Sequence, residues 1–171
     1  MYVLKYVLLV IVFCTSTVIG ILISKKYSNR VLILKDLKNA LNIFEVKINF
    51  SFQTIPEIFN EISDKVKGVV GKTFRDTVIN INSKNMLAGK AWEASVDENC
   101  VELKKEDIDC IKSLGKLLGS TDIDGQISQI KLVNEFINNQ IDEAIQEKNK
   151  NAKMYQKLGA IIGLIIVIVL I

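Results

Sequence analysis

The sequence predicts an all-α protein in which a helical bundle lies between two membrane-spanning helices, one at each end of the chain. Three observations predict this class. Both ends are uncharged apolar runs, the middle repeats apolar residues at steps of three and four, and the 171 residues include a single proline. Such steps follow one face of a helix, and proline is the residue that most strongly breaks one. We therefore expect an N-terminal anchor at residues 1–25, a helical bundle at 26–153 and a C-terminal membrane segment at 154–171.

The first apolar run extends from Tyr6 to Ile23 and carries no charge. As a helix it spans about 27 Å, which is enough to cross the hydrocarbon core of a bilayer. A cleaved signal peptide is the alternative, but no small-residue cleavage site follows, because the run continues as "ILISKKYSNR". Phe13 is also too bulky to precede a lipoprotein cysteine at Cys14. We expect an uncleaved anchor.

The second apolar run, Leu158 to Ile171, is shorter and reaches about 21 Å, a length that is also typical of a buried core helix. It has no polar face, however, and Lys157 can extend toward the headgroups, so that the segment from Met154 reaches about 27 Å. Gly159 and Gly163 form a G-x-x-x-G pattern, which is typical of contacts between membrane helices. We expect insertion, with these two glycines as a candidate helix contact.

Positive charges flank the central segment at both of its ends. They are Lys25, Lys26, Arg30 and Lys35 after the first run, and Lys148, Lys150, Lys153 and Lys157 before the second. On the outer side of the two runs there are only Lys5 and the amino terminus. Because lysine and arginine concentrate on the cytoplasmic side of a membrane, we predict that the bundle is cytoplasmic and that both termini lie across the membrane.

Within the central segment, an apolar stripe predicts a helix over Val31–Phe50. Thr54 and Glu57 form a capping box around Pro56 and predict the start of a second helix. Further helices are expected after Gly71, over Leu87–Asn99 with Trp92 turned inward, and from near Leu103 to a cap at Gly119. A last helix is expected to run with little interruption from Ile123 into the C-terminal run.

Two short motifs resemble ligand sites. "VKGVVGKTF" contains the second half of a phosphate-binding loop, but Val66 stands where the first glycine is needed, and no strand precedes it. We interpret Gly68 and Gly71 as a turn between helices. "STDIDGQ" lacks the glycine and glutamate positions of a calcium loop, so Asp122 and Asp124 are interpreted as helix caps.

The composition argues against an enzyme. There is no histidine, the three cysteines form no C-x-x-C pair, and no nucleophile–base pair can be assembled. We therefore predict no catalytic residue, no metal and no cofactor. A net charge of +3 is too small to indicate nucleic acid binding.

Two segments carry a resemblance to a known family. "LGKLLGSTDIDGQISQIKL", followed by "KMYQKLGAIIGLIIVIVLI", resembles stage III sporulation protein AB of endospore-forming bacteria over essentially the whole chain. "TIPEIF", "LAGKAWEA" and "LGSTD" also resemble, in the same order, motifs of the inner-membrane platform protein (its F-type domain) of type II secretion and type IV pilus systems. Secretion platforms carry two soluble domains where this chain has one.

The resemblance implies a role rather than an activity. It implies a membrane component of the channel complex between mother cell and forespore, located in the mother-cell membrane around the forespore. The implied partners are a cytosolic ATPase of the stage III sporulation protein AA family and the other stage III sporulation A-operon membrane proteins. A sensor or a structural anchor with the same layout is the alternative, and self-association is left open.

The length of the last helix predicts where a partner would dock. From Asp122 to Leu158 a straight helix is about 54 Å long, which places the turn before it far from the bilayer. The candidate docking residues of this distal turn are Gly115, Gly119, Asp122, Asp124 and Gln126, with nearby acids Glu106, Asp107 and Asp109. We expect these carboxylates to attract a basic partner surface. A solvated helical hairpin is the alternative.

Overall fold

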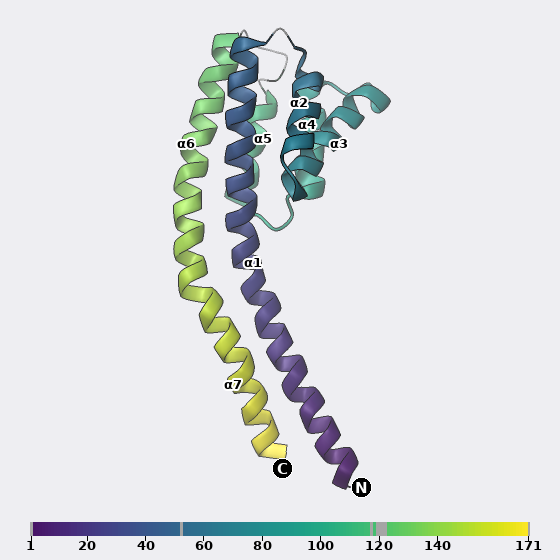
Figure 1. Cartoon of the computed structure of the whole chain (residues 1–171), viewed down its shortest axis with the longest axis vertical. Coiled ribbons are helices and arrows are strands. Elements are labelled where there is room, and N and C mark those ends of the chain that lie inside the picture. The colour runs from purple at the N-terminus through teal and green to yellow at the C-terminus, as the bar shows by residue number, and fades with distance from the viewer. Residues whose placement is uncertain (1, 52, 117, 119–122, 171) are drawn as a thin grey trace. The chain divides into compact units, whose positions relative to one another are not determined.

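The computed structural model describes residues 2–51, 53–116, 118 and 123–170, and all regular elements over these residues are helical (Figure 1). The all-α prediction is confirmed. In chain order the helices are α1 (Tyr2–Phe50), α2 (Ile55–Lys65), α3 (Gly68–Lys84), α4 (Ala88–Asn99), α5 (Lys105–Ser113), α6 (Ile123–Glu147) and α7 (Lys153–Leu170). A 3₁₀ turn, Leu114–Lys116, follows α5, and a π-helical segment, Lys148–Ala152, joins α6 to α7.

The chain forms two compact units. The first consists of Met1–Val31 and Glu143–Ile171, and the second of Leu32–Asp142. Helices α1 and α6 each contribute to both units. The predicted domain limits at residues 25 and 153 mark where the chain is expected to enter and leave a membrane. The division into two units does not test these limits, and they stay a prediction.

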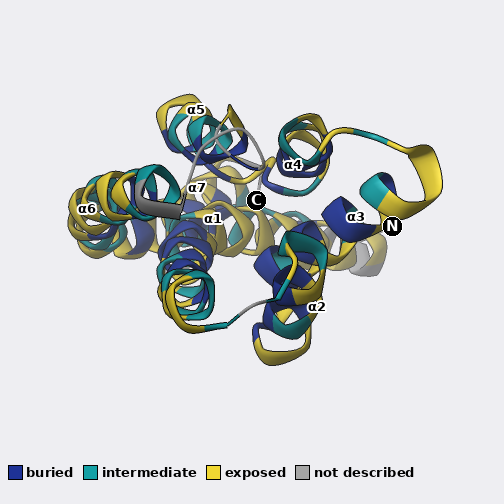
Figure 2. Ribbon diagram, turned by 90° about the horizontal axis from the view of Figure 1, so that it is seen from above, coloured by how far each residue is buried: buried dark blue, intermediate teal, exposed yellow. Residues whose placement is uncertain are grey.

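The second unit is a helical bundle with an aromatic centre. Phe44, Phe59, Phe74 and Trp92, from four successive helices, are fully buried. Their neighbouring ring centroids lie 4.8 to 5.7 Å apart, mostly edge to face, which is the favourable geometry for aromatic pairs. Trp92 Nε1 donates a hydrogen bond to the carbonyl of Ile111 at 2.8 Å, so its polar atom is satisfied. The prediction that Trp92 faces inward is confirmed, and Figure 2 shows the buried faces of α2, α3 and α4 turned away from solvent.

Helix α2 begins where the capping box predicts. The backbone N–H of Thr54 donates to Glu57 Oε2 at 2.7 Å, and hydrogen bonding by Thr54 lowers the pKa of Glu57. The acid is therefore held in its charged form at the positive end of the helix dipole.

The turn predicted at Gly68 and Gly71 is shorter than expected. Gly68 has a φ of +72°, which favours glycine, but Gly71 lies in the first turn of α3. A Cβ at Gly71 would lie 1.9 Å from the carbonyl oxygen of Val66. The second glycine therefore permits α3 to pack against the end of α2, and its assignment to the turn is wrong.

The last helix runs with little interruption from Ile123 to Leu170, as predicted, except that its hydrogen-bonding pattern changes in one five-residue segment. The π-helical segment Lys148–Ala152 separates α6 from α7. The predicted caps at Gly119 and Asp122 lie outside the described residues.

Candidate functional site: an antiparallel pair of apolar helices

The first unit pairs the N-terminal part of α1 with α7 (Figure 1). Among the residues that the structure describes, two helices are long and apolar enough to cross a membrane, one within Tyr6–Phe50 and the other within Gly125–Val169. Only 17% of each apolar window is buried, whereas the core helix of a soluble protein is mostly buried. These helices indicate membrane association.

The backbones of the two helices meet at Gly20 and Gly159. A Cβ at Gly159 would lie 2.9 Å from both Gly20 Cα and the carbonyl oxygen of Ser16, and a Cβ at Gly20 would lie 2.7 Å from the carbonyl oxygen of Tyr155. Ser16 Oγ donates a hydrogen bond to the carbonyl of Gly159 at 2.7 Å. Small residues that permit such an approach, together with a hydrogen bond between helices, are typical of helix contacts in lipid.

The candidate contact residues Gly159 and Gly163 both face α1. A Cβ at Gly163 would lie 3.1 Å from Phe13 Cδ2. Sequence reasoning missed the opposing face on α1, although Ser16, Gly20 and Ser24 follow a spacing of four within an apolar run. That spacing is the signal that could have found it. The role of the contact in a bilayer stays a prediction.

Polar contacts extend the pairing beyond the glycines. Gln156 Nε2 donates to Ser24 Oγ at 3.0 Å. The rings of Tyr27 and Tyr155 stack with centroids 5.9 Å apart and an interplanar angle of 14°. Tyrosine is enriched at the membrane–water interface, so the ring pair is of the kind expected at headgroup level.

An ion cluster around a buried arginine, with two half-buried glutamates, follows the tyrosine pair. Arg30 is 4% exposed, its Nη1 donates to Glu147 Oε2 at 2.8 Å, and its Nη2 lies 3.9 Å from Glu143 Oε2. The sequence identified Arg30 only as an orienting charge. Its partners are more than a hundred positions away, and the sole hint is that two glutamates four positions apart precede a lysine-rich stretch.

The π-helical segment places the glutamates and the glycines on one face. Glu147 and Gly159 are twelve positions apart, which in an ideal α-helix separates their directions by about 120°. One additional residue in a π turn changes the phase by about 100°, so the two residues point in nearly the same direction. This rotation explains how both contact α1.

The candidate docking residues of the distal turn are only partly described. Gly115 lies in the 3₁₀ turn and is buried against α4: a Cβ there would lie 2.8 Å from the carbonyl oxygen of Gly89 and 2.9 Å from Trp92 Cδ1. Gly115 is thus placed as a packing residue. Gly119 and Asp122 lie outside the described residues, while Asp124 and the half-buried Gln126 lie in the first turn of α6.

The acids near this turn are fewer than expected. Asp107 is 1% exposed and accepts a hydrogen bond from the backbone N–H of Lys104 at 3.1 Å, so it caps α5. Glu106 lies beside it in the first turn, and the nine residues of α5 place that turn about 13 Å from the 3₁₀ turn. Asp107 is therefore not an exposed acid, whereas the exposed Glu106 lies outside the turn itself and its part in a docking surface stays a prediction.

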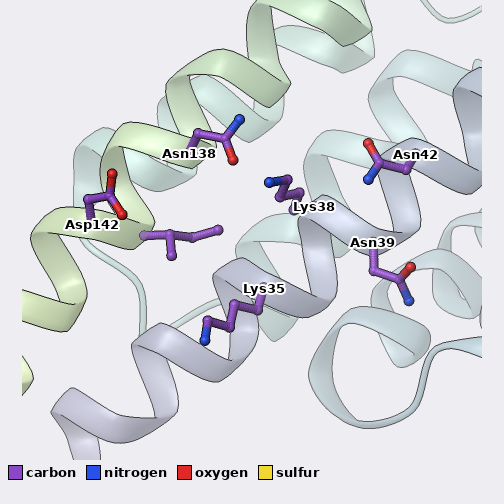
Figure 3. A pocket seen from close by; sticks show the side chains of 7 residues that line it. Lys35, Lys38, Asn39, Asn42, Asn138 and Asp142 are labelled. Carbon is purple, nitrogen blue, oxygen red and sulfur yellow. The ribbon is translucent and has the colours of Figure 1, made fainter.

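A polar groove of about 390 Å³ lies between α1 and α6 in the second unit (Figure 3). It is lined by Lys35, Lys38, Asn39, Asn42, Asn138, Ile141 and Asp142. These side chains offer amides and ammonium groups with one carboxylate, and they contain no nucleophile–base pair. Among the described residues there is also no group of three His, Cys, Asp or Glu side chains that could hold a metal ion.

The fold and the helix pair define a class of protein: a membrane-associated helical bundle. Comparison with known proteins identifies the family. The family model described as stage III sporulation protein AB matches residues 5–171, so the chain belongs to the stage III sporulation protein AB family. Membership supports a role in sporulation and confirms the resemblance.

The chain is also similar to two relatives of the same description, one by sequence and one by fold. The chain is 26% identical over 169 residues to stage III sporulation protein AB of Bacillus subtilis (strain 168), covering 98% of this chain and 99% of the relative. A solved structure of stage III sporulation protein AB (SpoIIIAB) is similar with a TM-score of 0.66 and 22% identity, covering 71% of this chain and 98% of that one. The second likeness concerns the fold alone.

The ion cluster gives a first prediction. Glu147→Gln leaves the buried guanidinium of Arg30 without its nearest carboxylate, which should lower the free energy of unfolding by about 3 kcal/mol. Thermal unfolding of the full chain in detergent measures the loss. Adding Arg30→Met, which removes the stranded cation, should recover most of it.

The matched control is Lys131→Gln, which removes an exposed ion pair with Glu45 at 3.9 Å and should change the stability by less than about 0.5 kcal/mol. If Glu147→Gln and Lys131→Gln lowered the free energy of unfolding by the same amount, the Arg30 cluster would stabilise the protein no more than an ion pair at the surface.

Proposed function

We propose that this protein is a non-enzymatic membrane platform component of the sporulation channel complex between mother cell and forespore. In this role it connects a cytosolic ATPase to the membrane-embedded channel proteins. The observation that carries the proposal is the combination of family membership with a paired set of apolar helices and a separate helical bundle. Such a layout provides a membrane anchor and a protein-binding domain in one chain.

The proposed location is the mother-cell membrane around the forespore, with the bundle in the cytoplasm. The basic residues that flank both apolar runs support this orientation, because the positive-inside rule counts charges close to the spans. A cytoplasmic bundle is required if the motor is cytosolic.

The proposed partners are an ATPase of the stage III sporulation protein AA family and other membrane proteins of the stage III sporulation A operon. The proposed motor contact is the distal turn with Gly115, Gly119, Asp122, Asp124 and Gln126, where the two carboxylates would attract the partner. Gly115 packs closely against Gly89. Two experiments distinguish the platform from the alternatives. The orientation test distinguishes it from a sensor, and the docking test distinguishes it from a structural anchor without motor contact.

Orientation is tested with an introduced cysteine, since the native thiols are poor probes. Cys100 is buried and burial raises its pKa, while burial raises the pKa of Cys110 to about 11. Little thiolate is therefore present at neutral pH. Ser83, exposed near the end of α3, is the better position.

In a chain with Cys14 and Cys110 replaced by serine, we expect Ser83→Cys to react with a membrane-impermeant maleimide only after cells are lysed. An introduced cysteine on a known external protein is the positive control. Labelling in intact cells would place the bundle outside and would favour the sensor.

Motor docking is tested by charge reversal. Asp122→Lys with Asp124→Lys should weaken binding of the full chain to the purified ATPase by about tenfold, because complementary charge at the contact is replaced by repulsion. Asp122→Asn with Asp124→Asn removes the charge but keeps residues able to cap a helix, and it should give a smaller loss in the same direction.

The matched control reverses two exposed acids elsewhere on the second unit, Glu98→Lys with Glu102→Lys. Trp92 fluorescence reports whether each variant keeps its aromatic centre. Undiminished binding by the distal variant, or an equal loss in the control, would remove the distal turn as the motor contact.

A further inference from the structure

Charge is divided unevenly between the two units. The first unit contains eight lysine or arginine residues and only two acidic residues, Glu143 and Glu147. Both glutamates lie against Arg30, at 3.9 and 2.8 Å. No other acid in this unit remains to neutralise its lysines.

Six of these lysines gather at the polar end of the apolar helices. We call them the lysine collar: Lys25, Lys26, Lys148, Lys150, Lys153 and Lys157. All but the half-buried Lys148 are exposed. They come from both helices, and the faces that α1 and α7 use to contact one another carry Ser24, Tyr27 and Tyr155 instead. The collar therefore points outward from the helix pair.

The collar lies at the depth where lipid headgroups are expected. Lys26, Lys153 and Lys157 are within two positions of the stacked tyrosines, which are interfacial residues by type. Lys148 and Lys150 precede Tyr155 by five to seven positions, or about 8 to 10 Å of helix, which is close to the Debye length of about 8 Å at physiological salt.

From this arrangement we propose that the lysine collar is a binding site for the headgroups of anionic phospholipids. Clusters of four to eight basic residues directly beside a membrane helix attract acidic lipids, and each one adds to the attraction. The two ends of the chain supply the site jointly, so it forms only when α1 and α7 are paired. The proposal does not depend on contact with a motor.

The experiment reconstitutes the full chain in phosphatidylcholine vesicles with a trace of spin-labelled lipid. The fraction of probe that the protein immobilises is compared between phosphatidylglycerol and phosphatidylcholine probes. We expect at least about threefold preference for phosphatidylglycerol, and its loss when salt is raised to about 1 M, where the Debye length falls to about 3 Å. Equal association of both probes with the unaltered protein would overturn the proposal.

Substitution locates the preference. Replacing all six collar lysines with glutamine should abolish it, whereas replacing them with arginine should retain it. The matched control replaces six exposed lysines of the second unit with glutamine and should also retain it: Lys65, Lys67, Lys84, Lys90, Lys105 and Lys131. A preference that survives in the collar variant, or that disappears in the control, contradicts the assignment.

Competition separates bilayer lipid from a free anion. At matched ionic strength, added glycerol phosphate should leave the preference for phosphatidylglycerol unchanged, because the collar acts where headgroups are held at high density. Complete displacement by glycerol phosphate would show a site for a soluble phosphate compound and would overturn the lipid assignment.

Discussion

The contact between the backbones of Gly20 and Gly159 is the constraint on which the first unit depends. Lipid tails are as apolar as the helices, so in a bilayer hydrophobicity alone would not hold two such helices together. Close backbone approach and a hydrogen bond from Ser16 to the Gly159 carbonyl are the contacts that join them in this structure. Once this contact sets the register, Ser24 meets Gln156, Tyr27 meets Tyr155 and the collar lysines are left outside.

The π-helical segment Lys148–Ala152 makes that register compatible with the ion cluster. A regular α-helix would direct Glu147 and Gly159 toward different sides, and one of the two contacts with α1 would be lost. With the additional residue in the turn, Arg30 contacts the carboxylate of Glu147 and Gly20 contacts Gly159 at the same time. A π segment interrupts the regular hydrogen-bonding pattern of an α-helix, and such segments occur mostly where a specific contact requires them.

Local signals in the sequence predicted the features that depend on neighbouring residues. The helical class, the capping box at Thr54 and Glu57, and the inward Trp92 all follow from spacing or residue type over one or two turns. Gly159 and Gly163 were found because their pattern lies within one helix.

Features that depend on distant residues could not be predicted in the same way. The partners of Arg30 are supplied by a helix at the other end of the chain, so no window of sequence contains the pair. Gly71 and Asp107 were misread although their contacts are local, because residue type alone does not distinguish the two roles. Gly71 packs on the Val66 carbonyl instead of forming the turn, and Asp107 accepts a hydrogen bond from Lys104 instead of being an exposed charge.

Cysteine cross-linking tests whether the two ends of the chain pair in the membrane in one register. Ser24→Cys with Gln156→Cys, in a chain whose three native cysteines are serine, is treated with a short thiol cross-linker in native membranes. The register predicts efficient cross-linking within one chain for this pair, whose side chains are hydrogen-bonded, and little for Lys25→Cys with Gln156→Cys, because Lys25 points outward. Equal cross-linking of both pairs, or of neither, would contradict the account.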